Sequence, residues 1–173
     1  MKQHLLAILA IFVLTSGLVV GCGQKQSTTE LRSYIEQGLP IMGRHTETTE
    51  STNQANRALL EALGRGSQKE VLKALTTYRD MLEWALIRVD SELLDFKALT
   101  PPPQARDFHT LMIDGLLKEQ TGLTKLLSYY SSVLRYGFGD DKELEDGNRL
   151  LLEAQKSWLR AKYEMQDLMQ KMK

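Results

Sequence analysis

Apolar side chains recur every three or four residues along most of the chain, which is the spacing of one face of an α-helix. Breaks with glycine or proline separate four such segments, at about residues 30–63, 67–99, 103–136 and 140–172. No segment alternates apolar and polar residues as a half-buried strand does. Because short connections place successive helices antiparallel, the pattern predicts an all-α fold, an up-down-up-down four-helix bundle.

The ends of the first two predicted helices carry local signals. Residues 27–30 and 67–70 both have the Ser-x-x-Glu spacing of a capping box, so we expect a helix to begin at each. Proline lacks the backbone donor that a helix interior uses. Pro40, two residues after Gly38, is therefore expected to bend or break the first helix.

Two further expectations concern the packing of the second and third helices. Gly115 and Gly122 are seven residues apart, and the absence of side chains would let a neighbouring backbone approach closely. Arg88 and Glu92 are four residues apart on the second helix. We expect them to form a solvated ion pair on its outer face.

The first helix contains a long polar stretch. Residues 43–58 include no large apolar side chain, over about 24 Å of helix. Two interpretations remain open: the stretch leans away from a core made by the other helices, or it forms the polar wall of a groove. In the second case, heptad spacing turns four of its side chains inward. With one glutamate of the third helix, the candidate ligand-binding residues are His45, Thr49, Thr52, Asn56 and Glu119.

Glu119 is the one acid in the apolar stripe of the third helix. A buried carboxylate needs a partner, and His45 is the candidate nearest to its level in the bundle. The first and third helices are diagonal in this topology, so contact between the two requires a thin core. The alternative is that Glu119 turns to solvent at the edge of the stripe.

Composition excludes several classes of function. The chain has 22 basic and 22 acidic residues, so its charge gives no argument for a nucleic-acid partner. Its single cysteine excludes disulfides within the chain. It has no H-E-x-x-H, G-x-S-x-G or glycine-rich phosphate motif, and we expect neither enzyme activity nor a cofactor.

The N-terminus has the layout of a secretory signal peptide. A short basic start precedes an apolar run from Leu5 to Val20, which is too short and too interrupted for a comfortable membrane span. The run ends in two aliphatic residues, a small residue and a cysteine. This ending, Val19 to Cys22, resembles the lipobox of bacterial lipoproteins, which more often has leucine at the first position. The alternative is an ordinary secreted protein with a stray cysteine.

The lipoprotein resemblance implies a domain organisation and a location. It implies a cleaved signal peptide at residues 1–21, and a diacylglycerol on the Cys22 sulfur with acyl chains such as palmitate. A polar tether would follow at residues 22–29 and the bundle at residues 30–173. The protein would then be lipid-anchored in the cell membrane or outer membrane, facing the extracytoplasmic side.

A second motif lies at the start of the third helix, where a double proline precedes a histidine and several leucines. It resembles a loose class of small bacterial helical lipoproteins, and the resemblance implies no particular activity. The motif residues are Pro102, Pro103, His109, Leu111, Leu116 and Leu117.

Metal ligands are sparse. Neither His45 nor His109 has the Glu-x-x-His partner of di-iron bundles, so we expect no metal site of that kind. Each histidine does have a methionine three residues away, Met42 and Met112. Thioether and imidazole together suit cuprous copper, although methionine is also an ordinary core filler.

These observations favour a membrane-anchored lipoprotein that acts as a non-enzymatic helical binding or interaction module in the bacterial cell envelope. Its partner would be an envelope protein or a small ligand. One alternative is a protein that binds an envelope ligand or cuprous copper. Another is an enzyme that uses His45 and Glu119 as a base pair.

Overall fold

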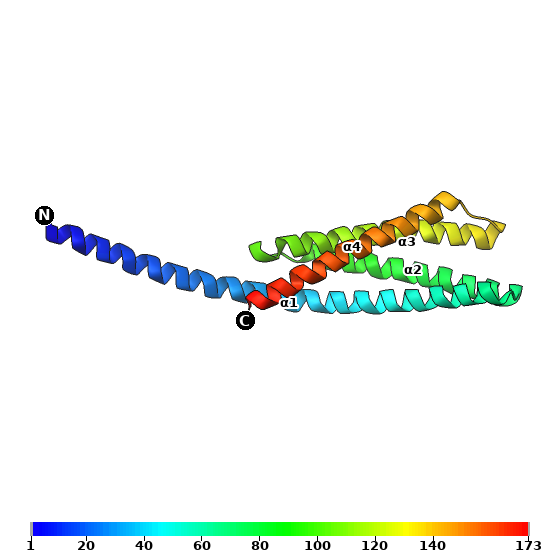
Figure 1. Ribbon diagram of the computed structural model, residues 1–173, viewed down its shortest axis with the longest axis horizontal. Helices are drawn as coiled ribbons and strands as arrows, with labels where there is room; N and C mark the ends of the chain where they lie inside the picture. The colour runs from blue at the N-terminus through cyan, green and yellow to red at the C-terminus, as the bar shows by residue number, and fades with distance from the viewer. Residues whose placement is uncertain (1, 173) are drawn as a thin grey trace.

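The computed structural model describes the backbone of residues 2–172 and the side chains of residues 28–172. Within that part, successive long helices run in opposite directions and no strand occurs, so the predicted all-α four-helix bundle is confirmed (Figure 1). The elements are α1 (Lys2–Arg65), α2 (Gln68–Ala98), the short 3₁₀ helix η1 (Pro103–Ala105), α3 (Arg106–Tyr136) and α4 (Asp141–Lys171).

The predicted signal peptide (1–21) and Cys22 lie outside the residues whose side chains are described, as does most of the predicted tether (22–29). These predictions stay predictions. No helix in the described part of the chain is long and apolar enough to cross a bilayer.

Local signals in the sequence account for the starts of α2 and α4 and for the end of α3. The Ser67 side chain accepts a hydrogen bond from the backbone N–H of Glu70 at 3.5 Å, which confirms the predicted start of α2. Asp140 caps α4 in the same way, at 2.9 Å from the N–H of Lys142. Gly137 ends α3 with a positive φ of 83°.

α1 does not begin at the predicted capping box, and Pro40 does not break it. The helix passes through residues 27–30 and through Pro40 without a break. Pro40 and Glu36, the residue whose carbonyl loses its partner, are both exposed, so the missing hydrogen bond lies on the solvent side. On the core side, Ile35 and Ile41 are buried and hold the helix across the proline.

The core is centred on α2 and α3. Its largest fully buried side chains include Leu82 and Phe96 of α2, and Phe108 and Met112 of α3. α1 packs against α2, α2 against α3, and α3 most extensively against α4. α1 and α4, the first and last helices, have few close backbone contacts, and the bundle is open between them.

The two glycines of α3 account for its close packing against α4. A Cβ on Gly122 would stand 3.0 Å from the carbonyl oxygen of Gly147. This confirms the expected close approach of a neighbouring backbone at Gly122. At Gly115 the neighbour is instead a side chain, because a Cβ there would stand 3.2 Å from Cε2 of the Trp158 indole.

We predict that Gly122→Val lowers the free energy of unfolding by about 1–3 kcal/mol, because the new side chain collides with α4. Urea denaturation of the full chain measures this change. Gly43→Val is the matched control, since a Cβ on Gly43 meets nothing within 4 Å. It should stay within about 0.5 kcal/mol of the parent. Equal effects of the two changes would contradict the packing at Gly122.

Candidate functional site

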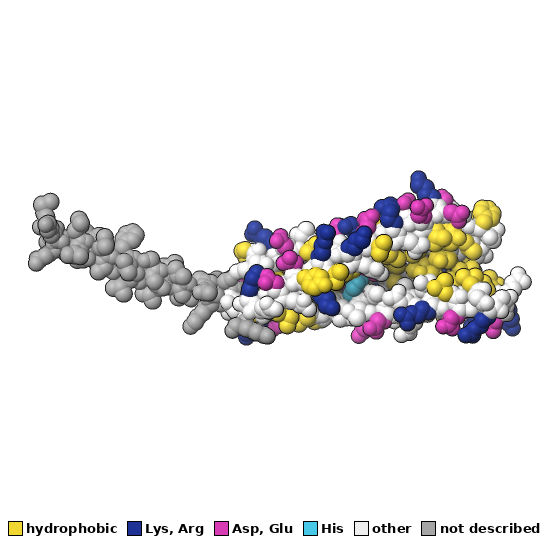
Figure 2. Space-filling view, in the orientation of Figure 1, with side chains coloured by type: hydrophobic (Ala, Val, Ile, Leu, Met, Phe, Trp, Pro, Cys, Tyr) yellow, Lys and Arg dark blue, Asp and Glu magenta, His cyan; other side chains and the backbone are white. Residues whose placement is uncertain are grey.

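A groove of about 460 Å³ runs between α1 and α4, with α3 at its base. Figure 2 shows apolar side chains gathered in the opening between the helices. Its volume lies within the range of small-molecule pockets. The apolar side chains that line it are Met42, Leu123, Leu151, Ala154, Trp158 and Leu159.

The α1 side of the groove is the polar stretch of the sequence, so the interpretation as a polar wall describes the geometry. Asn56 is half-buried but does not line the groove, so the structure leaves this candidate outside the site. Besides His45, the lining residues of the stretch are Thr46, Thr49, Glu50, Thr52 and Asn53.

Hydroxyl groups of this wall are bonded to their own helix. Thr46 donates to the carbonyl of Met42 at 3.0 Å, and Thr52 donates to that of Thr48 at 2.9 Å. Such a bond satisfies the hydroxyl and leaves mainly the γ-methyl group for contact with a ligand. At these two threonines the wall therefore presents short side chains to the groove, and it is less polar there than its composition suggests.

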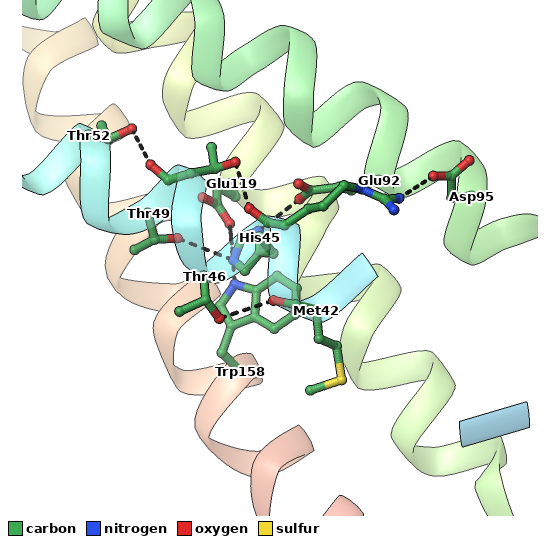
Figure 3. Close-up of polar contacts among 11 residues, drawn as sticks. Met42, His45, Thr46, Thr49, Thr52, Glu92, Asp95, Glu119 and Trp158 are labelled. Carbon is green, nitrogen blue, oxygen red and sulfur yellow. Dashed lines mark hydrogen bonds and ion pairs between the residues drawn. The ribbon is translucent and has the colours of Figure 1, made fainter. Parts of the chain in front are cut away.

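An imidazole held between two carboxylates lies at the base of the groove (Figure 3). His45 Nδ1 is 3.0 Å from Glu92 Oε2 on α2, and His45 Nε2 is 3.3 Å from Glu119 Oε2 on α3. The His45 and Glu119 side chains are 12% and 13% exposed, whereas that of Glu92 is 1% exposed. The predicted pairing of His45 with Glu119 is thus present, across the diagonal of the bundle.

Trp158 of α4 completes this His45 cluster, which consists of His45, Glu92, Glu119 and Trp158. Its indole is stacked on the His45 ring, with centroids 4.1 Å apart and an interplanar angle of 25°. Its Nε1–H donates to Glu119 Oε2 at 3.3 Å. The cluster therefore joins side chains from all four helices.

The carboxylates control the protonation of His45. Burial lowers the pKa of His45, but the hydrogen bond to Glu92 and the charges of Glu119 and Glu92 together raise it above its usual value of 6.5. Burial also raises the pKa of Glu119 above 4.5, and Glu92 adds to this, while His45 and Trp158 oppose it. At neutral pH the geometry favours a protonated imidazole.

Sequence reasoning missed Glu92, which was predicted to pair with Arg88 on the outer face. That prediction was wrong: Glu92 is buried beside His45, and the Arg88 guanidinium lies 5.6 Å from the centroid of the Trp84 ring. A signal for Glu92 was present. It falls between Val89 and Phe96 in a four-three-four spacing with Ala85, so it occupies a core position of the α2 stripe.

Thr49, His45 and Glu92 partly resemble a nucleophilic triad. The contact of His45 with Glu119 argues against catalysis of that kind. Thr49 Oγ1 lies 3.5 Å from His45 Nε2, and Glu92 bonds to the opposite ring nitrogen. A general base needs a free lone pair on Nε2. Glu119 also faces Nε2 at 3.3 Å and raises the pKa of His45, which disfavours a free lone pair on that nitrogen.

The arrangement gives the copper alternative no support. Met42 lines the groove beside His45, but both His45 nitrogens face carboxylates. The second histidine, His109, has its Nδ1 3.0 Å from the Tyr34 hydroxyl. Among the described residues, no group of three or more His, Cys, Asp or Glu side chains is placed to hold a metal ion.

No family model, curated protein or solved structure matches the chain. The fold and the site define the chain as an all-α four-helix bundle that is open between its first and last helices. Arguments about its function therefore depend on the groove and the His45 cluster.

The elevated pKa of His45 predicts how stability changes with pH. A folded state that raises a pKa binds the proton more tightly than the unfolded chain does. The stability from protonated His45 is complete below about pH 6.5 and is lost as the pH rises through the folded-state pKa. We therefore expect the urea midpoint of the full chain to fall as the pH rises above 6.5.

His45→Gln should reduce this dependence, because glutamine does not titrate, while Glu119, whose pKa burial also raises, keeps a contribution of the same sign. Burial lowers the pKa of His109, so its contribution to stability increases with pH. That increase is complete above about pH 6.5 and does not affect the range above it. Burial raises the pKa of Tyr34 and Tyr78 above 10, so both stay protonated below about pH 10. A slope that is unchanged in His45→Gln would contradict the assignment.

Proposed function

We propose that this protein is a lipid-anchored, non-enzymatic binding module of the bacterial cell envelope, and that the groove between α1 and α4 holds its ligand. The observation that carries the proposal is the groove itself, an opening of about 460 Å³ with apolar side chains and a buried ionic cluster at its base. Small-molecule sites commonly combine an apolar lining with a few placed polar groups.

Binding is favoured over catalysis by the state of the cluster. Carboxylates face both nitrogens of its imidazole and raise the pKa of His45, which favours a positioning role over proton exchange. Trp158 and Glu119 are likewise fixed by contacts within the cluster. Pre-organised side chains of this kind lower the cost of ordering a site around a ligand.

The proposed anchor is the Cys22 sulfur, and its support comes from the lipobox resemblance of Val19 to Cys22. A single acyl chain binds membranes only reversibly, so two or more chains are needed for stable anchoring. The bundle would then lie outside the cytoplasm, close to the membrane surface.

Cys22→Ser should abolish lipidation, because the sulfur is the only thiol in the chain. We expect the parent protein to enter the detergent phase on phase partitioning and to carry the added mass of a diacylglycerol. The variant should be uncut or should remain in the aqueous phase. A mature parent protein without the added lipid mass would refute the anchor and leave the groove proposal intact.

The groove predicts opposite effects of one substitution on stability and on binding. Thr52 lines the hydrated groove, so Thr52→Leu should add apolar contact and raise the free energy of unfolding by about 0.5–2 kcal/mol. The larger side chain should also weaken the binding of an uncharged probe, 4-phenylbutan-1-ol, by several-fold. Urea denaturation and calorimetric titration of the full chain measure the two effects.

Thr76→Leu is the matched control. Thr76 is an exposed threonine on α2 whose hydroxyl donates to Leu72, as that of Thr52 donates to Thr48. The change should leave both stability and probe binding close to those of the parent. If 4-phenylbutan-1-ol fails to bind the parent, the groove is not a binding site for apolar ligands.

A further inference from the structure

The His45 cluster contains more negative than positive charge. Two carboxylates, Glu92 and Glu119, surround a single imidazole. With both acids ionised and His45 protonated, the cluster has one uncompensated negative charge. Such a charge is costly in a buried site unless a cation or a proton neutralises it.

Two cations adjacent in sequence to members of the cluster pair with other acids. Arg44, next to His45 in sequence, pairs with Asp95 at 2.5 Å, and Lys118 pairs with Asp114 at 2.6 Å. Lys162 lines the groove, yet among the described side chains no ion pair joins it to Glu119. Among the described side chains, the imidazole of His45 is the one cation that forms an ion pair with Glu92 or Glu119.

Burial adds a second sign of incomplete pairing. Oε1 of Glu92 is buried and has no hydrogen-bond partner among the described residues. Buried carboxylate oxygens without partners are rare, because each has lost its water without replacement. The oxygen without a partner is on the α2 side of the cluster. Glu119 is the carboxylate of the cluster that lines the groove.

Glu119 is placed to contact a ligand. Both of its described contacts, the ion pair with His45 Nε2 and the hydrogen bond from Trp158 Nε1, are made by Oε2. A carboxylate has about four lone-pair sites, so it can accept further hydrogen bonds. Beside it, Trp158 and Leu151 provide an apolar surface along α4.

We propose that the groove binds a small organic cation, with a primary ammonium group on Glu119 and an apolar body along Trp158 and Leu151. The ammonium supplies the positive charge that the cluster lacks, and the apolar body replaces water in the opening. This inference depends on the proposed binding function and names its ligand class.

The dimensions of the groove fit a small molecule. Its α1 wall extends from Met42 to Asn53, about 16 Å of helix. A chain of four carbons that ends in a phenyl ring is shorter than this wall and reaches from Glu119 along α4. The volume of about 460 Å³ has room for such a body.

Three probes with the same apolar body test the proposal: 4-phenylbutylamine, 4-phenylbutan-1-ol and 4-phenylbutyrate. They are titrated at pH 7.5 into the full chain carrying Trp84→Phe. The chain has two tryptophans, so Trp158 then reports on the groove by its fluorescence, and calorimetry gives an independent affinity. We expect the amine to bind about tenfold or more tightly than the alcohol, and the carboxylate to bind weakest.

Glu119→Gln should remove the advantage of the amine and leave the affinity for the alcohol within about twofold. Glu61→Gln is the control for net charge, because Glu61 is exposed on α1, outside the groove, beside Arg65. It should retain the preference for the amine. The three-probe comparison on the parent tests the proposal even if Glu119→Gln does not fold.

The outcomes separate this inference from the proposed function. If the alcohol binds as tightly as the amine, or the carboxylate binds more tightly, the inference is wrong and the groove remains an apolar binding site. If the amine preference persists in Glu119→Gln, Glu119 is not its contact and the inference is likewise wrong. If no probe binds, the proposed function fails as well.

Discussion

One imidazole, held between two carboxylates, connects the four helices at the centre of this bundle. His45 reaches from α1 to carboxylates on α2 and α3, and its ring supports the indole from α4. At this level the polar stretch of α1 offers no large apolar side chain to the core. Charge-assisted contacts replace the apolar contacts that a bundle ordinarily uses, and they are directional, so they fix the rotation of α1.

The groove follows from the same constraint. With His45 turned toward α2 and α3, the α1 wall of the groove includes short threonines, and the hydroxyls of Thr46 and Thr52 are bonded to their own helix. Such side chains do not fill the space to Leu151 and Trp158. About one turn before Leu151 on α4, Gly147 packs closely against Gly122 of α3. α4 is thus held toward α3, and the bundle stays open toward α1.

Sequence periodicity predicted the helices, the capping box at Ser67 and the close approach at Gly122 because these depend on local chemistry and regular spacing. At Pro40 it allowed a bend or a break, and the helix is unbroken there because burial on one face of α1 outweighs one missing hydrogen bond on the solvent side. It failed at Glu92. A carboxylate is normally assigned to solvent, and only the position of His45 on another helix reveals why this one is buried.

The His45 cluster and the groove together explain why the polar stretch of α1 differs from an ordinary bundle helix. Leucines at these positions would fill the groove and strengthen contact with α4. Natural proteins give up stability of this kind where a site must stay open. The desolvated carboxylate of Glu119 is a second departure from maximal stability, at the base of the same opening. The unfilled groove and the desolvated carboxylate lie in one cavity. A single ligand would account for both features, whereas two separate packing defects would each need their own cause.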